Sequence, residues 1–277
     1  MTGNHERRPA VDGAMLRLDR ADNASGGPVR QPETPEEALA YLDAGSRAFA
    51  ELGTKAIDLR LSPEALGIGP EDNGGILVQE PFAAVLSCSD ARVPIEFALG
   101  QAANELFVVR VAGNAPGSEC RGSLHYAAQH LPSVQIFAVI GHSRCGATTA
   151  AVDAMLRPEN YLDIATDGPL REIIDPLLAG VTFAHRALLD AHGPEVVSSP
   201  DYRGHLITLS TLANTALSAL VIEHDLNRAC AFGVYKLSAR QVGVRRRDGW
   251  NAGFAMAPKD GREIEKLVRE AAESLIA

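Results

Sequence analysis

The chain has 277 residues, of which 46% are hydrophobic and 22% are charged, and its formal net charge at pH 7 is −9. This length can bury a full-sized core, the composition is ordinary for a soluble globular protein, and no run of 18 or more apolar residues predicts a membrane span. The negative charge disfavours nucleic acid as a partner, because phosphate binding needs a basic surface.

The first 33 residues are polar and rich in Pro, Gly, Asn and Arg, without helical or strand periodicity, which predicts a flexible tail. They also lack the apolar core of a secretory signal, so a cytoplasmic location is expected. At Thr34 the pattern changes, since an N-cap residue is followed by Pro at the first helical position and then by two acids. Apolar residues recur at helical spacing up to Gly53, which predicts an N-terminal helical arm.

Short apolar runs rich in β-branched residues begin at residue 82. They do not alternate with polar residues, which suits strands covered on both faces, as in a parallel sheet. The predicted strands cover 82–87, 106–111, 135–140, 228–235 and 241–244, and the predicted helices 94–100, 119–130, 146–155, 170–191, 207–225 and 261–276. The basic run 245–247 is interpreted as a solvated turn. The sequence therefore predicts an α/β fold, a mainly parallel central β-sheet flanked by helices, in one domain over residues 34–277.

The four cysteines are too few for a disulfide scaffold at this length, and they point to metal binding or reactive thiols instead. Two of them lie in the segments CSDAR (88–92) and GHSRCG (141–146), each of which directly follows a predicted strand. In open α/β sheets, sites form beyond the carboxyl ends of the strands. Both segments are therefore expected to face one cavity if their strands are neighbours.

Thiolate and imidazole are ligands that zinc favours, and catalytic zinc sites commonly use three protein ligands with one position open. Cys88, His142 and Cys145 offer such a set, with two ligands on one short turn and the third from another strand end. The period of extended chain allows Cys88, Asp90 and Arg92 to project to one side, where the guanidinium would pair with the carboxylate. Spacing alone leaves alternatives open: buried cysteines that act as small hydrophobes, a satisfied polar histidine, or a thiol nucleophile with its base.

Three motifs in order, CSDARV, LFVVRVAGN and GHSRCGA, resemble the β-class carbonic anhydrase family, most clearly between residues 79 and 150. The resemblance implies that Cys88, His142 and Cys145 bind one zinc ion per chain. It also implies that Asp90 and Arg92 form the catalytic pair, in which Arg92 holds Asp90 away from the metal and leaves the fourth position to water.

The resemblance further implies three substrate-binding residues. Gln79 lies where some members place an amide that hydrogen-bonds substrate, Tyr126 falls near a position that lines the pocket, and the backbone N–H of Gly146 would contact substrate. Gln79 as a polar loop residue and Tyr126 as an ordinary helix-face aromatic are the alternatives. The sequence names no proton shuttle, although His125 and His130 lie in the right region of the chain.

The sequence also departs from the family pattern. Val85 stands where some members carry a Trp of an inhibitory bicarbonate site, so that site is not expected. Ala91 replaces the commoner serine, a small change that leaves the metal ligands intact. The usual pocket residues are not evident after Asn114.

The function implied by the resemblance is zinc-dependent, reversible hydration of carbon dioxide to bicarbonate and a proton, by a carbonate dehydratase that forms a homodimer or homotetramer. The site would lie near a subunit boundary, with neither membrane nor nucleic acid as partner. In some members the aspartate becomes the fourth zinc ligand at low pH, and Asp90 would then give activity that rises steeply above neutrality. Three alternatives remain: a carbonyl sulfide or carbon disulfide hydrolase on the same scaffold, a Cys88–His142 thiol hydrolase, and a zinc-stabilised interaction module.

Overall fold

The computed structural model describes residues 31–52 and 74–275 together with residues 15–17, 58–60, 63 and 66–69. Most of the predicted tail, residues 1–14 and 18–30, and the expected helix stop at Gly53 lie outside the described residues. The helices are α1 (Pro35–Glu51), α2 (Ile95–Ala98), α3 (Ser118–His130), α4 (Gly146–Leu156), α5 (Pro158–Ala165), α6 (Gly168–His192), α7 (Tyr202–Leu226) and α8 (Gly261–Glu273). The strands are β1 (Met15–Arg17), β2 (Asp58–Arg60), β3 (Ala83–Ser87), β4 (Leu106–Arg110), β5 (Ile136–His142), β6 (Cys230–Lys236), β7 (Gln241–Arg246), β8 (Gly249–Ala252) and β9 (Ala255–Met256).

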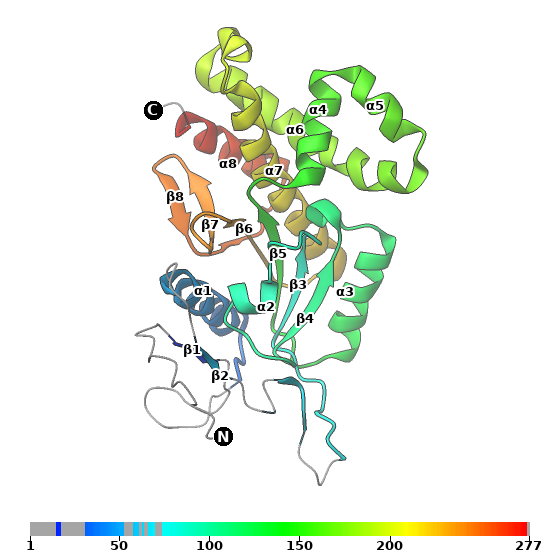
Figure 1. The fold of residues 1–277 in the computed structure, drawn as a ribbon, viewed down its shortest axis with the longest axis vertical. Coiled ribbons are helices and arrows are strands. Elements are labelled where there is room, and N and C mark those ends of the chain that lie inside the picture. Colours follow the sequence, from blue (N-terminus) through cyan, green and yellow to red (C-terminus); the bar gives the residue numbers. More distant parts are fainter. Residues whose placement is uncertain are drawn as a thin grey trace, which may run out of the picture.

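One mixed sheet forms the centre of the molecule, with the strand order β4-β3-β5-β6-β7-β8 (Figure 1). Strand β9 also pairs with β6. The four strands β4, β3, β5 and β6 are parallel, whereas β7, β8 and β9 add antiparallel pairs at one edge. Parallel strands need long crossover connections, and helices supply them here. The predicted α/β fold with a mainly parallel sheet and an N-terminal helix is confirmed.

Helices cover both faces of the sheet, which explains why the central strands read as unbroken apolar runs. All five residues of β3 are buried, and they alternate between two cores. Ala83 and Val85 pack in the cluster that contains residues of α1 and α2, and Ala84 and Leu86 pack in the larger cluster under α3, α4, α6, α7 and α8.

The first long helix begins as the sequence predicts. Thr34 has an extended backbone and its side-chain oxygen accepts a hydrogen bond from the Glu37 N–H at 3.1 Å, as an N-cap does. Helix α1 then lies against its own sheet rather than projecting from it. Asp43 accepts from the Phe254 N–H and Ser46 from the Val242 N–H, both at 2.9 Å, so polar side chains of α1 satisfy backbone groups near the antiparallel edge.

Helix α7 is long and apolar enough to cross a membrane by length and composition alone. Its most apolar 18-residue window has a mean hydropathy of 1.5, and 67% of that window is buried inside the protein. A membrane helix must present its apolar side chains to lipid, so this burial fits a helix of the core.

The structure differs from the sequence reading in the connections and at the antiparallel edge. Helix α5 and strands β8 and β9 were not expected, because each is too short to show a clear period. The interpretation of the basic run as a solvated turn is wrong for Arg245, which lies within β7 and is half-buried. Within the predicted tail, β1 pairs in parallel with β2 over three residues.

Candidate metal centre

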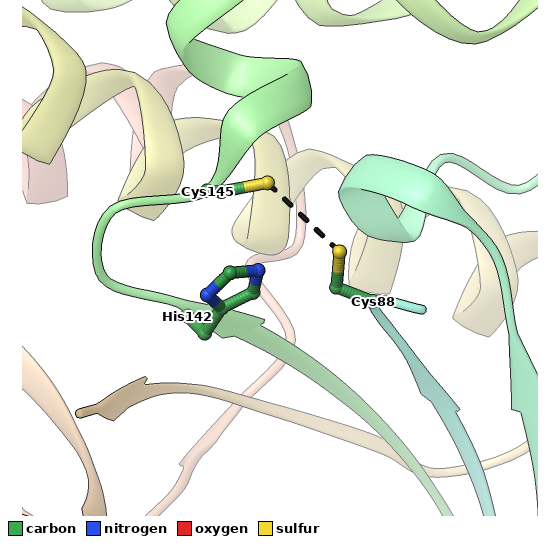
Figure 2. Close-up of side chains that lie close together, drawn as sticks. All are labelled: Cys88, His142 and Cys145. Atoms are coloured by element: carbon green, nitrogen blue, oxygen red, sulfur yellow. Dashed lines mark hydrogen bonds between the residues drawn. The ribbon is translucent and has the colours of Figure 1, made fainter. Parts of the chain in front are cut away.

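The three candidate ligands meet at the carboxyl ends of two neighbouring strands. Strand β3 pairs with β5, with Ser87 opposite Ile140, so Cys88 follows one strand where His142 ends the other. Cys145 is the N-cap residue of α4, one short turn after His142. Figure 2 shows the two thiols and the imidazole ring converging from these elements. The expectation that both segments face one place is confirmed.

The ligand atoms have the spacing of a metal site. The Sγ atoms of Cys88 and Cys145 are 4.0 Å apart, and all three candidate ligand atoms lie within 4.8 Å of one another. In a tetrahedral zinc site with Zn–S bonds of about 2.3 Å, two sulfurs are about 3.8 Å apart. All three residues are buried, and His142 is fully so, with 0% exposure. The donor set therefore fits zinc with small adjustments.

The imidazole of His142 is oriented for a metal. Its Nδ1 lies 3.0 Å from the carbonyl oxygen of Ser143, which can only accept, so Nδ1 carries the proton and Nε2 presents its lone pair. Nε2 is buried and has no hydrogen-bond partner among the described residues. A buried, unpartnered nitrogen costs free energy unless something binds it. A metal ligand whose other ring nitrogen is held by a carbonyl accounts for both observations.

The two thiols cannot both ionise easily without a cation between them. The hydrogen bond to Cys145 and burial raise the pKa of Cys88, whereas the hydrogen bond from Cys88 lowers the pKa of Cys145. One proton is thus retained between the two sulfurs. A divalent cation would let both become thiolates, because it supplies the positive charge that the buried pair lacks.

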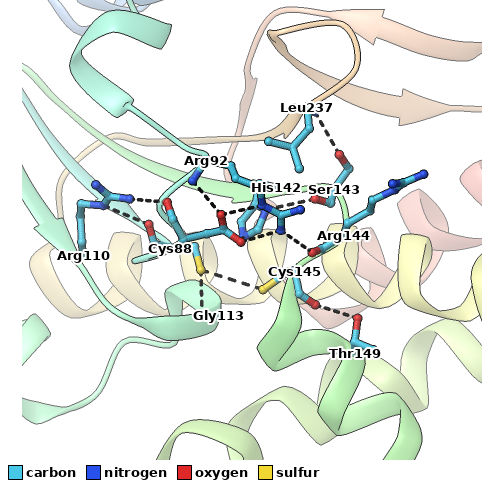
Figure 3. A network of polar contacts seen from close by, with 11 residues as sticks. Cys88, Arg92, Arg110, Gly113, His142, Ser143, Arg144, Cys145, Thr149 and Leu237 are labelled. Carbon is cyan, nitrogen blue, oxygen red and sulfur yellow. Dashed lines mark hydrogen bonds and ion pairs between the residues drawn. The ribbon is translucent and has the colours of Figure 1, made fainter.

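Asp90 and Arg92 form a bidentate pair. Figure 3 shows Arg92 beside the three candidate ligands. The guanidinium of Arg92 donates from Nε and Nη2 to the two carboxylate oxygens at 2.9 and 2.7 Å, and its backbone N–H donates to Oδ1 at 2.9 Å. These bonds hold the pKa of Asp90 well below its usual range, with Arg92 as the main cause. Oδ2 of Asp90 lies 3.7 Å from Nε2 of His142, so the carboxylate borders the ligand cluster. Arg92 is itself held, since Nη2 also donates to the Arg144 carbonyl at 3.1 Å.

Arg110, whose role was not predicted from the sequence, shapes the loop that carries Cys88 and Asp90. This last residue of β4 stands opposite Ser87, and its guanidinium donates to the carbonyl oxygens of Cys88 at 3.0 Å and Asp90 at 2.7 Å. A charged residue at the end of an apolar strand was the only sign of this role in the sequence. Its partners, the Cys88 and Asp90 carbonyls, depend on how β4 pairs with β3.

Two glycines allow close contacts that position the candidate ligands: Gly113 with Cys88, and Gly141, next to His142, with helix α7. Gly113 has φ +69°, a conformation that favours glycine, and its N–H donates to Sγ of Cys88 at 3.3 Å. Gly141 precedes His142 in β5, and a Cβ there would lie 2.1 Å from the hydroxyl oxygen of Thr215 on α7. Glycine at 141 therefore lets α7 pack directly against the strand that carries the histidine.

The residues expected from the resemblance to bind substrate are not all brought to this place. Gly146 begins α4 immediately after Cys145, and a Cβ there would meet no atom within 4 Å, so its backbone borders open space. Gln79 is exposed and precedes the amino end of β3, with Asn104 near it. The five residues of β3 separate it from Cys88 by about 16 Å at 3.3 Å per residue.

Tyr126 also lies away from the ligands within one chain. Its ring centroid is 6.3 Å from that of Phe107, near the amino end of β4, and 5.0 Å from that of His130. His125 pairs instead with Asp225 at 3.1 Å, at the end of α7. All three side chains make these contacts away from the ligand cluster, so neither His125 nor His130 is brought to it as a proton shuttle within one chain.

Comparison with known proteins gives consistent matches. Residues 83–178 match the family model described as carbonic anhydrase. A carbonic anhydrase of Mycolicibacterium smegmatis is 30% identical over 144 residues, which cover 50% of this chain and 67% of that protein. Carbonic anhydrase 2 of Mycobacterium tuberculosis is 40% identical over 77 residues, which cover 28% of this chain and 37% of that protein.

Two solved structures are similar at 20% sequence identity. One comes from the tetrameric β-carbonic anhydrases of Sordaria macrospora, with a TM-score of 0.45 and coverage of 62% of this chain and 83% of that one. The other is the β-carbonic anhydrase CcaA, with a TM-score of 0.48 and coverage of 68% and 84%. Both scores lie below 0.5, so the assignment rests on the sequence matches.

A mainly parallel α/β sheet with two thiols and an imidazole at adjacent strand ends defines the chain as a candidate metalloenzyme of the α/β class. The family-model match and the match to the carbonic anhydrase of Mycolicibacterium smegmatis, of which 67% is covered, identify the family. The chain belongs to the β-class carbonic anhydrase family, and its enzyme class is carbonate dehydratase.

Proposed function

We propose that this chain hydrates carbon dioxide reversibly to bicarbonate and a proton, with one Zn²⁺ held by Cys88, His142 and Cys145. The observation that carries the proposal is the Asp90–Arg92 pair, set 3.7 Å from the unpartnered nitrogen of His142. A purely structural metal site has four protein ligands and no need for a paired carboxylate beside it. The relatives named above are carbonic anhydrases, and no observation favours carbonyl sulfide or carbon disulfide instead.

Bound zinc supplies a Lewis acid that lowers the pKa of a coordinated water to about 7. Asp90 has acceptor oxygens that would orient a water at the ligand cluster, because Oδ2 lies 3.7 Å from Nε2 of His142. The two bonds from Arg92 keep the carboxylate ionised and fix its direction, so Asp90 would be held as a hydrogen-bond acceptor beside the metal rather than as a fourth ligand. The backbone carbonyl of Arg144 in turn fixes Arg92, so the pair does not depend on solvent for its geometry.

The start of α4 offers a place for the substrate or product. The N–H groups at a helix N-terminus carry partial positive charge and favour an anion such as bicarbonate. Gly146 lies there, beside Cys145, and a Cβ built on it would meet no atom within 4 Å. Its N–H is the proposed substrate contact from the described chain.

The proposed roles of Gln79 and Tyr126 require more than one chain, since neither lies near the ligands of its own chain. Large apolar side chains close to Gln79 are 52% to 69% exposed: Leu66, Ile68, Ile76 and Val78. Monomers rarely expose contiguous apolar surface of this kind, which supports a homo-oligomer with this segment at its interface. Light scattering that finds a monomer at micromolar concentration would remove this part of the proposal. The cytoplasmic location and the single domain over 34–277 stay predictions.

The reaction is tested by stopped-flow carbon dioxide hydration on protein whose zinc content has been measured. Cys145→Ala is expected to lose both zinc and hydration, and Cys120→Ala, which removes a thiol of α3 outside the cluster, is the matched control. Asp90→Asn is expected to keep zinc and lose hydration. Zinc at about one per chain without hydration in the unaltered protein would refute the proposed reaction.

A further inference from the structure

A cavity of about 200 Å³ lies beside the loop that joins His142 to Cys145, and Ser143 and Arg144 of that loop line it. Helix α7, strands β6, β7 and β8, and Leu275, two residues after the end of α8, form the rest of its lining. Most of its walls are apolar, and the main contributors are Leu209, Leu212, Val234, Trp250 and Leu275. None of the chemistry proposed above uses this space.

The charged side chains that line the cavity are all positive. They are Arg144, Lys236 and Arg245, and no carboxylate lines the cavity. Within the described part of the chain, none of the three forms an ion pair. Lys236 places Nζ 5.4 Å from the ring centroid of Trp250, and Nη1 of Arg245 donates to the hydroxyl of Ser274 at 3.1 Å. Burial lowers the pKa of Arg245, the direction expected for a cation without a counter-charge.

The indole of Trp250, which lines the cavity, carries a donor that the described part of the protein does not use. Its Nε1 is buried and has no hydrogen-bond partner among the described residues. The side-chain hydroxyls of α7 at the cavity, Thr208 and Thr211, donate to carbonyls of their own helix at 3.0 and 2.9 Å. The cavity is thus lined by cations without carboxylate partners in the described chain, and a ligand that satisfies them must bring acceptor oxygens and negative charge.

The volume limits the rest of the ligand. A cavity of about 150 Å³ accommodates benzene, so this one holds a single ring or a branched aliphatic body with a small polar head. We propose that the cavity binds a small monocarboxylate whose apolar body packs on the leucines and whose carboxylate meets Lys236 and Arg245. This site is separate from the proposed carbon dioxide site and does not depend on it.

The cavity has a route to solvent and a contact with the metal loop. A wider hollow of about 780 Å³ shares Ser143, Arg144 and Lys236 with it and extends to Arg92. Arg144 has a φ of +60°, and its carbonyl accepts from Arg92. A carboxylate in the cavity would therefore lie beside Ser143 and Arg144, which connect His142 at the end of β5 to Cys145 at the start of α4.

The chain contains one tryptophan, Trp250, so its fluorescence reports on this cavity alone. The full-length protein as purified is titrated with cyclohexanecarboxylate, with neutral cyclohexanecarboxamide as the matched control, and the same titrations are followed by calorimetry. We expect a saturable change in emission with the carboxylate only. Lys236→Met keeps the length of the side chain and removes its charge, and it is expected to weaken binding about tenfold or more.

A second variant, Thr208→Phe, fills the mouth of the cavity from an exposed position of α7 and is expected to abolish binding without a charge change. Equal affinity for the carboxylate and the amide would overturn the proposal, as would unchanged binding in Lys236→Met. So would the absence of both heat and emission change up to about 10 mM ligand. Binding that Cys145→Ala abolishes while Lys236→Met retains it would place the carboxylate on the metal and also overturn it. Failure of carbon dioxide hydration would leave the result unaffected.

Discussion

Replacement of Gly141 by alanine is expected to destabilise the protein through one defined contact. The added Cβ would lie 2.1 Å from Oγ1 of Thr215, whereas ordinary van der Waals contacts begin near 3.4 Å. Thr215 is fully buried, and its hydroxyl donates to the Thr211 carbonyl at 2.7 Å, so it cannot rotate away freely. Either α7 or β5 must therefore move by more than one ångström.

Overpacking of a well-packed core costs about 1–3 kcal/mol, and Gly141→Ala should fall in this range. Thr215→Ala alone should cost about 1 kcal/mol through its lost buried hydrogen bond. In the double variant the clash with Oγ1 is gone, and ordinary contacts remain with the Cβ at position 215 at 3.4 Å and with Cγ2 of Thr211 at 3.5 Å. The double variant should then be more stable than the sum of the single effects predicts, by about 1–2 kcal/mol.

The assay is urea unfolding of all four proteins, with a chelator in every sample so that differences in metal binding do not enter the free energy. Zinc per chain is measured separately, and Gly141→Ala should retain less because His142 follows directly on the displaced strand. Destabilisations that add within about 0.3–0.5 kcal/mol would refute the reasoning, since independent sites behave in that way.

Three further predictions follow from other contacts. Arg110→Leu removes the donors to the Cys88 and Asp90 carbonyls, and should lower kcat/KM for hydration about 10–100-fold with more activity retained in Arg110→Lys. Removal of metal with a chelator should lower Tm by about 5–10 °C, reversed by added zinc, as for a ligand at about 100 times its Kd. The hydrogen bonds from Arg121 lower the pKa of Asp225 to about 2, so their stabilisation is full above the ordinary carboxyl pKa of about 4 and lost as the pH falls towards 2. In urea unfolding, Asp225→Asn should therefore be less stable than the unaltered protein at pH 6, with a difference that disappears between pH 4 and 2.

The sheet and the ligand set were accessible from sequence because they depend on short-range patterns. Buried parallel strands give unbroken apolar runs, and polar residues directly after such runs lie at the carboxyl edge of the sheet. Cys88 and His142 meet because β3 and β5 are neighbours, which the resemblance implied and the register shows. The roles of the ligands and of Asp90 and Arg92 stay predictions that the geometry supports.

Other parts of the site depend on pairing that no local pattern reveals. From the sequence, Arg110 is only the last residue of a predicted strand. The register that pairs it with Ser87 is what brings its guanidinium to the carbonyl oxygens of Cys88 and Asp90. Arg245 was interpreted as part of a solvated basic run. In the structure the unexpected strand β8 places Trp250 opposite Arg245, and both residues line the cavity. Gln79 was assigned by its distance along the chain, and β3 then carries Cys88 to the opposite end of the sheet.

Helix α7 shows how an apolar element can still serve a polar site. Its buried polar residues Asn214, Thr215 and Ser218 lie on one face of the helix because of their spacing. A hydropathy profile alone shows them only as polar positions within an apolar helix. Asn214 donates to the Gly113 carbonyl at 2.8 Å, and Ser218 donates to the next carbonyl at 3.3 Å. Because the Gly113 N–H donates to Sγ of Cys88, this face of α7 fixes the turn that hydrogen-bonds a metal ligand. The helix therefore contributes to the site from behind the sheet, and its polar residues are expected to matter for metal retention as much as for packing.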